Sequence, residues 1–216
     1  GLSTLDILAM ARQLIQTRHG KSIEYADLPL SEPDIMDSFA CANTNGVFQF
    51  ESPGMKKLLR DLAKGGPLSF DDIAVATALY RPGPMDAGLM ADFVQIRQGL
   101  RSPHYDHPHM ERALKATGSI LVYQEQVMQL AVDVAGFSLA DADRLRVAMG
   151  KKDKDKMEAM REQWCAGCHT VSGLTPEVAS ALFDKMAAFA GYGFNRSHAI
   201  GYSVISVWTM WLRVRY

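Results

Sequence analysis

The sequence has 216 residues, of which 48% are hydrophobic and 22% charged, and its formal net charge is −1 at pH 7. This composition is ordinary for a globular protein and excludes a generally basic nucleic-acid binder, so any nucleic-acid site must be a local patch. No apolar run is long enough to cross a bilayer. The three cysteines suit a reducing, cytoplasmic setting better than a disulfide-stabilised fold.

Apolar residues recur at helical spacing along most of the chain, and capping residues, prolines and glycines separate the segments. Residues 47–50 are the exception, because their Val, Phe and alternation favour a short strand. The sequence therefore predicts a mainly α fold with at most short strands. Since the chain does not begin with Met and ends within a helical pattern, we expect it to be a piece of a longer protein. The predicted helices cover about residues 3–20, 31–40, 52–64, 69–80, 85–99, 124–135, 138–150, 151–172, 175–190 and 197–216.

Residues 189–199, here called the corner, separate the last two helical patterns. Glycine allows close backbone approach or a positive φ, and Asn and Ser are preferred helix N-caps. Free N–H groups at a helix start, with an arginine beside them, make a natural anion site. The alternative is a helix–turn–helix connection whose glycines serve packing alone. The candidate residues of the anion site are Gly191, Gly193, Asn195, Arg196, Ser197 and His198.

Two further cationic positions could meet phosphate. Arg81 stands in a stiff Arg-Pro-Gly-Pro sequence, and arginine binds phosphate in bidentate fashion. Lys151 and Lys152, with Arg144 and Arg146 in the preceding helix, could form a local basic wall for a phosphate backbone. The alternatives are a simple helix terminator with a solvated arginine, and a solvated helix end.

A c-type haem protein is a second interpretation, because Cys165, Cys168 and His169 match the CxxCH attachment pattern. Haem attachment requires export, and no export signal is visible, so we expect a coincidence. Neither a zinc-type spacing among the histidines of residues 104–109 nor a carboxylate pair suited to two-metal phosphoryl transfer is found. We therefore predict no metal site and no catalytic residue within this sequence.

Five stretches, in this order and spacing, resemble the fingers region of the bacterial DNA polymerase III alpha subunit, a family of replicative C-family polymerases. Arg196 stands where many members are expected to carry lysine, and the run at residues 200–203 (IGYS) is also unusual. This leaves a diverged copy, such as an accessory or phage polymerase, or an error-prone paralogue, as an alternative. A non-enzymatic DNA-binding module is a further alternative. The stretches are residues 46–55 (GVFQFESPGM), 78–85 (ALYRPGPM), 123–128 (YQEQVM), 148–152 (AMGKK) and 189–198 (FAGYGFNRSH).

The resemblance implies that residues 1–30 border the palm and that residues 31–216 form the fingers domain. It implies binding of an incoming dNTP by Arg81 and the candidate residues of the corner, and phosphate or DNA contacts by Lys151 and Lys152. The Mg²⁺-binding catalytic aspartates are expected outside this chain, so the isolated chain should be inactive. The partners implied for the whole polymerase are primer–template DNA, a sliding clamp, a proofreading exonuclease and clamp-loader subunits, without a membrane.

Overall fold

The computed structural model describes residues 2–151 and 153–216. Across these residues it holds twelve α-helices and three short 3-10 helices, and its β pairing is limited to an isolated parallel bridge between Tyr123 and Phe194. The prediction of a mainly α fold is therefore confirmed. None of the helices in the described ranges is long and apolar enough to cross a membrane.

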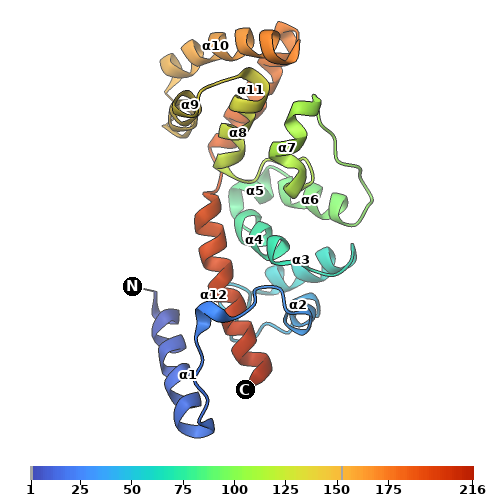
Figure 1. Ribbon diagram of the computed structural model, residues 1–216. Coiled ribbons are helices and arrows are strands. Elements are labelled where there is room, and N and C mark those ends of the chain that lie inside the picture. The colour runs from blue at the N-terminus through green and yellow to red at the C-terminus, as the bar shows by residue number, and fades with distance from the viewer. Residues whose placement is uncertain (1, 152) are drawn as a thin grey trace. The chain divides into compact units, whose positions relative to one another are not determined.

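The chain forms two compact units, residues 1–77 with 200–216 and residues 78–199, and each is described by itself. The predicted boundary near residue 30, between palm and fingers, stays a prediction. The first unit contains α1 (Ser3–His19), η1 (Tyr25–Asp27), α2 (Pro33–Ala40), α3 (Pro53–Ala63), most of α4 (Phe70–Leu79) and most of α12 (Arg196–Arg215) (Figure 1).

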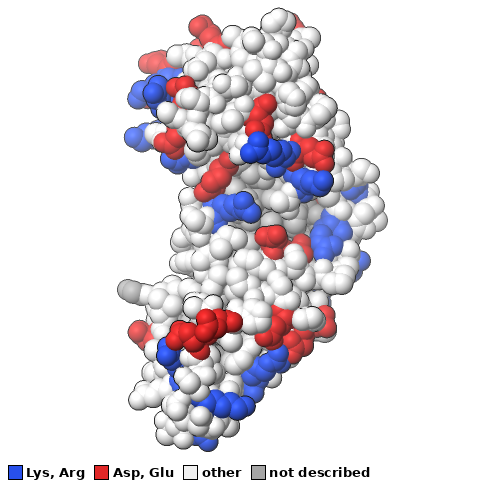
Figure 2. All heavy atoms as spheres, viewed as in Figure 1, with Lys and Arg blue, Asp and Glu red and all other residues white. Residues whose placement is uncertain are grey.

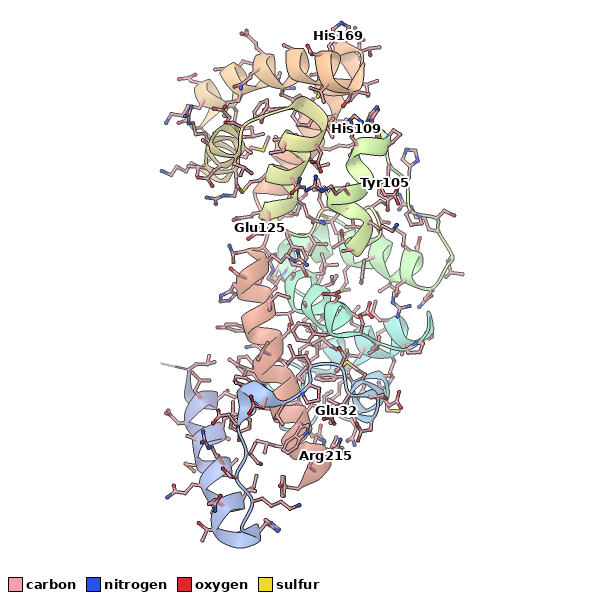
Figure 3. All side chains as sticks on the ribbon, viewed as in Figure 1. Glu32, Tyr105, His109, Glu125, His169 and Arg215 are labelled. Atoms are coloured by element: carbon pink, nitrogen blue, oxygen red, sulfur yellow. The ribbon has the colours of Figure 1, made fainter. Side chains whose placement is uncertain are left out.

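The first unit is organised around α12. The Tyr25 ring lies 5.5 Å from the Trp208 ring, and its hydroxyl donates a 2.8 Å hydrogen bond to the Leu8 carbonyl oxygen of α1. Near the end of α12, the Arg215 guanidinium binds the carboxylates of Glu32 and Asp34, at the start of α2 (Figure 3). These contacts attach both α1 and α2 to the same helix.

The predicted strand at residues 47–50 is wrong. The Phe48 N–H donates to the Thr209 hydroxyl of α12 at 3.1 Å, and the Phe48 carbonyl oxygen accepts from the Ser206 hydroxyl at 3.0 Å. Gln49 has a left-handed φ of 64°, which ends any extended run. The segment is a turn because side chains of α12 supply the hydrogen bonds that a partner strand would have supplied.

The second unit is built on α8, which packs against α9 and α10, while α10 also packs against α11. Trp164 of α10 is 1% exposed and donates a 2.7 Å hydrogen bond to the Ala179 carbonyl oxygen of α11. A Cβ added to Gly167 would lie 2.1 Å from the Ala135 carbonyl oxygen, so glycine is what lets α10 approach the end of α8. The helices are α5 (Pro82–Asp86), α6 (Leu89–Arg97), η2 (Pro108–Met110), α7 (Glu111–Leu114), η3 (Lys115–Thr117), α8 (Gln124–Ala135), α9 (Leu139–Lys151), α10 (Lys154–Ser172) and α11 (Pro176–Ala190).

Candidate functional site

The corner connects the end of α11 to the start of α12, and residues 189–199 all belong to the second unit. Helix α11 ends at Ala190 with Gly191 as its C-cap, and the Tyr192 N–H donates to the Phe189 carbonyl oxygen at 2.9 Å. Helix α12 begins at Arg196, one residue before the predicted start at Ser197. The polar cluster of the corner therefore forms the first turn of a long helix.

A parallel bridge places the corner beside the start of α8. The Phe194 N–H donates to the Val122 carbonyl oxygen at 3.2 Å, and the Phe194 carbonyl oxygen accepts from the Gln124 N–H at 2.9 Å. The buried Gln126 side chain fixes the other strand of the bridge, because its Oε1 accepts from the N–H groups of Val122 and Tyr123 at 2.8 and 2.9 Å. The N-terminal ends of α8 and α12 are thus neighbours.

Arg81 supports the corner. Its Nη2 donates to the Tyr192 carbonyl oxygen and its Nε to the Ala78 carbonyl oxygen, both at 2.8 Å. Its Cζ lies over the Phe194 ring, 4.4 Å from the centroid, in a cation–π contact. Burial lowers the pKa of the guanidinium from its ordinary value. The Arg-Pro-Gly-Pro sequence thus fixes an arginine, as expected, and two of its nitrogens hold the protein's own carbonyl groups.

The two candidate glycines differ in what the backbone requires. Gly191 has φ −65° and ψ −18°, a right-handed conformation that any residue adopts. A Cβ on Gly193 would lie 3.0 Å from Cε1 of Phe189 and 3.1 Å from Cγ of Gln124. Gly193 therefore allows the close approach of three segments, whereas the conformation of Gly191 places no such demand.

The first turn of α12 is capped from two sides. Oδ1 of Asn195 accepts from the His198 N–H at 2.9 Å and from the Ser197 hydroxyl at 2.6 Å, which makes Asn195 the N-cap. The Glu125 carboxylate of α8 accepts from the Arg196 N–H at 3.0 Å through Oε2 and at 3.1 Å through Oε1. The expectation of free N–H groups at this helix start is therefore wrong for Arg196 and His198, because protein acceptors already satisfy both.

The side chains at the start of α12 face solvent. Asn195, Arg196, Ser197 and His198 are all exposed. The Arg196 Cζ lies 5.9 Å from the Tyr123 ring centroid, and the His198 ring lies 5.4 Å from the Phe194 ring. The Tyr123 and Phe194 rings therefore lie against a single helical turn that exposes a guanidinium, a hydroxyl, an amide and an imidazole.

Lys151 lies elsewhere in the second unit. It is the exposed last residue of α9 and lines a groove of about 420 Å³ whose walls come from α9, α10 and Asp153. Acidic side chains, including Asp141 and Asp143, share this groove, and Figure 2 likewise shows both signs of charge intermixed on the visible face. Lys152, the other predicted phosphate contact, lies outside the described residues.

The CxxCH pattern falls within α10. Cys168 is fully buried in the helical core, and burial raises the pKa of its thiol to about 12. Cys165 is half-buried, and burial raises the pKa of its thiol as well. A thiol enclosed by packed helices cannot form a thioether to haem without opening the core, so the structure removes the basis of the haem interpretation.

Glu125 was not among the site residues predicted from the sequence. Figure 3 shows Glu125 at the N-terminal end of α8, beside the start of α12. The available signal was its place in the YQEQVM stretch, one of the five that carry the family resemblance.

Within the described residues, no three His, Cys, Asp or Glu side chains are grouped so that they could share a metal ion.

Comparison with known proteins finds that residues 4–172 match the family model described as "Bacterial DNA polymerase III alpha subunit finger domain". The whole chain is 44% identical to "DNA polymerase III subunit alpha" of Chlamydia pneumoniae and 40% identical to the protein of that name from Aquifex aeolicus. The chain spans 17% and 18% of the length of these relatives. The corner lies beyond the part matched by the family model but within both whole-chain alignments.

Proposed function

Because this chain belongs to the finger-domain family of the bacterial DNA polymerase III alpha subunit, we propose that its corner binds the incoming dNTP of a DNA-directed DNA polymerase. The polymerase would extend a primer during DNA replication in the cytoplasm.

The observation that carries this proposal is the exposed first turn of α12. The Glu125 carboxylate already complements the dipole at this helix start, so the positive charge open to a triphosphate is the exposed guanidinium of Arg196. A triphosphate needs fixed cations and hydrogen-bond donors that stay in place as charge develops in the transition state. Arg196 and His198 offer these groups in their side chains, while Asn195 shapes the turn together with the Ser197 hydroxyl, which donates to Asn195.

Arg81 and Gly193 have supporting roles in this proposal. Arg81 adds a fixed positive charge behind the corner and holds Tyr192 and Phe194, and Gly193 permits the tight path of the backbone. Gly191 caps the C-terminal end of α11, and from there the chain would turn toward the nucleotide. Lys151, with Lys152, would contact phosphates of the primer–template DNA.

The chemical step would depend on residues outside this chain. The described residues offer no grouped ligands for Mg²⁺, so aspartates of the palm would hold the ions that activate the primer terminus and stabilise the triphosphate. The isolated chain should therefore not synthesise DNA. The sliding clamp, the proofreading exonuclease and the clamp-loader subunits would bind other parts of the polymerase.

The test is Arg196→Ala in the full-length polymerase, with single-nucleotide incorporation measured against dNTP concentration. We expect incorporation efficiency to fall by roughly 10²-fold or more, which corresponds to ~2.7 kcal/mol of transition-state stabilisation. Affinity for primer–template DNA should not change. Arg196→Lys should retain more activity than Arg196→Ala, because it keeps the charge but not the forked geometry.

The matched control is Arg112→Ala, which removes an arginine with a 76% exposed side chain from the same unit. It should leave incorporation efficiency unchanged. Equal efficiencies of the Arg196→Ala and wild-type polymerases would contradict the proposed role of the corner.

A further inference from the structure

The starts of α8 and α12 meet at the Glu125 carboxylate. The residues joined by the parallel bridge, Tyr123 and Phe194, come just before the two helices. Each helix start carries partial positive charge, equivalent to roughly half an elementary charge. Glu125 is the second residue of α8 and accepts hydrogen bonds from the first residue of α12. One carboxylate therefore complements both helix ends.

Glu125 also determines which way the Asn195 amide faces. Its Oε1 accepts from Asn195 Nδ2 at 3.0 Å. With the nitrogen of the amide held by a carboxylate, the Asn195 oxygen faces α12, where it accepts from the His198 N–H and the Ser197 hydroxyl. If the amide were reversed, its nitrogen would face the His198 N–H and its oxygen would face the Glu125 carboxylate. Glu125 thus acts on Ser197 and His198 through Asn195.

We infer that Glu125 is a positioning residue for nucleotide binding: it holds the Asn195–His198 turn in one conformation before the nucleotide arrives. This inference rests on the proposed function of the corner. Groups that are already ordered lose less conformational freedom when they bind, and small misplacements of such groups reduce rates strongly. Ring contacts with Tyr123 and Phe194 support the side chains of Arg196 and His198 from one side, and these hydrogen bonds hold the backbone of the turn.

The opposing possibility is that Glu125 occupies the place of a phosphate and competes with it. The two roles predict opposite effects when the carboxylate is removed. A positioning residue makes nucleotide binding weaker when it is lost, whereas a competing anion makes it stronger.

The experiment compares Glu125→Ala, Glu125→Gln and Asn195→Ala with the wild type in the full-length polymerase. For each, the KM for dNTP, kcat, the Kd for primer–template DNA and the melting temperature are measured. We expect Glu125→Ala to raise KM about tenfold, with smaller changes in kcat and none in DNA affinity. Glu125→Gln should raise KM only a few fold, because its amide oxygen can still accept one of the N–H groups.

A double-mutant cycle tests whether Glu125 acts through Asn195. The double variant Glu125→Ala with Asn195→Ala should have a KM within about twofold of the worse single variant, because both remove the same restraint. Fully additive effects would overturn the inference. If Glu125→Ala has a lower melting temperature than the wild type, the test uses Glu125→Gln instead. An unchanged KM in a Glu125→Gln variant with the wild-type melting temperature would overturn the inference.

The control is Glu177→Ala. Glu177 is the exposed second residue of α11, and the hydrogen bonds that lower the pKa of its carboxyl come from its own backbone and Thr175. Glu177 therefore has the same position in α11 that Glu125 has in α8, but its hydrogen bonds stay at the start of its own helix. Its loss should not change KM. A fall in KM for Glu125→Ala would overturn the inference in favour of competition. An unchanged KM would also overturn it, and the Arg196→Ala result would then show separately whether the proposed function stands.

Discussion

Nη2 of Arg81 donates a 2.8 Å hydrogen bond to the carbonyl oxygen of Tyr192, a residue 111 positions later in the sequence. The same guanidinium lies over Phe194, whose backbone pairs with the segment before α8. Arg81 is thus a structural support of the corner, and its contribution to nucleotide binding should pass through Tyr192 and Phe194.

We predict that Arg81→Lys loosens the corner even though the charge is kept. A lysine cannot reproduce the forked hydrogen bonds or the stacking of the guanidinium. The loss of one hydrogen bond and part of a cation–π contact is worth about 1–2 kcal/mol of local stability. In the full-length protein, amide exchange over residues 189–199 should accelerate by roughly 5- to 30-fold when measured by mass spectrometry.

The control for this prediction is Arg112→Lys, since Arg112 is an exposed arginine whose ion pair with Asp133 lies outside the corner. Exchange over residues 189–199 should stay at the wild-type rate in this variant. A corner that exchanges equally in the Arg81→Lys and wild-type proteins would argue that Arg81 is dispensable for its structure.

The fold could be predicted because its signals are local. Periodic apolar residues, with capping residues and prolines between them, identified the longer helices, whereas α5 and α7 lie wholly or mostly outside the predicted ranges. Asn195 as an N-cap type is confirmed by its bond to the His198 N–H. The partners of the corner could not be predicted in this way. Glu125 and Arg196 are 71 positions apart, and helical periodicity reports neighbours three or four residues away.

Residues 47–50 show why a local signal can fail. Their side chains favour a strand, but a strand also needs backbone hydrogen bonds to a neighbouring strand. Ser206 and Thr209 of α12 supply hydroxyl groups to the backbone of Phe48, which bends the segment into a turn. Tertiary contacts decided this segment against its own propensity.

We predict that Lys151→Ala weakens primer–template binding without changing the KM for dNTP. A lysine that neutralises one phosphate releases about one counterion, so its loss should reduce the slope of log affinity against log salt by about one. Fluorescence anisotropy of labelled DNA, measured across a salt series with the full-length polymerase, gives this slope.

Lys115→Ala provides the comparison, because the Lys115 side chain is 76% exposed in the same unit. It should leave the slope unchanged. Identical slopes for the Lys151→Ala and wild-type polymerases would mean that the lysine contacts no DNA phosphate and is a solvated helix end.

We predict that Gly167→Ala destabilises the second unit by about 3 kcal/mol, at the upper end of the usual cost of overpacking. The new Cβ would meet the backbone carbonyl of Ala135, which cannot move aside as a flexible side chain could. Gly201→Ala is the matched substitution, because a Cβ on this helical glycine meets no atom within 4 Å. It should be neutral or stabilising by up to about 1 kcal/mol. Thermal unfolding should therefore occur at a lower temperature than in the wild type for Gly167→Ala and at the same or a higher temperature for Gly201→Ala, and a Gly167→Ala protein as stable as the wild type would contradict the close helix approach.

Cys168 should make the helical core sensitive to alkaline pH. The pKa of its buried thiol is raised to about 12, whereas an unfolded thiol has a pKa of roughly 8.5. Between these values the unfolded chain has lost the proton and the folded chain has kept it. The unfolded state thus binds fewer protons, and stability falls as pH rises, by up to about 1.4 kcal/mol per pH unit.

Replacing Cys168 by alanine removes this linkage. The variant should be less stable at neutral pH because it leaves a small void, yet its melting temperature should fall less than that of the wild type between roughly pH 7.5 and 9.5. Cys41→Ala should retain the wild-type decline, since Cys41 is exposed. Parallel declines in the Cys168→Ala and wild-type proteins would show that the thiol is accessible to water, because a solvated thiol would titrate alike in both states and contribute no pH dependence.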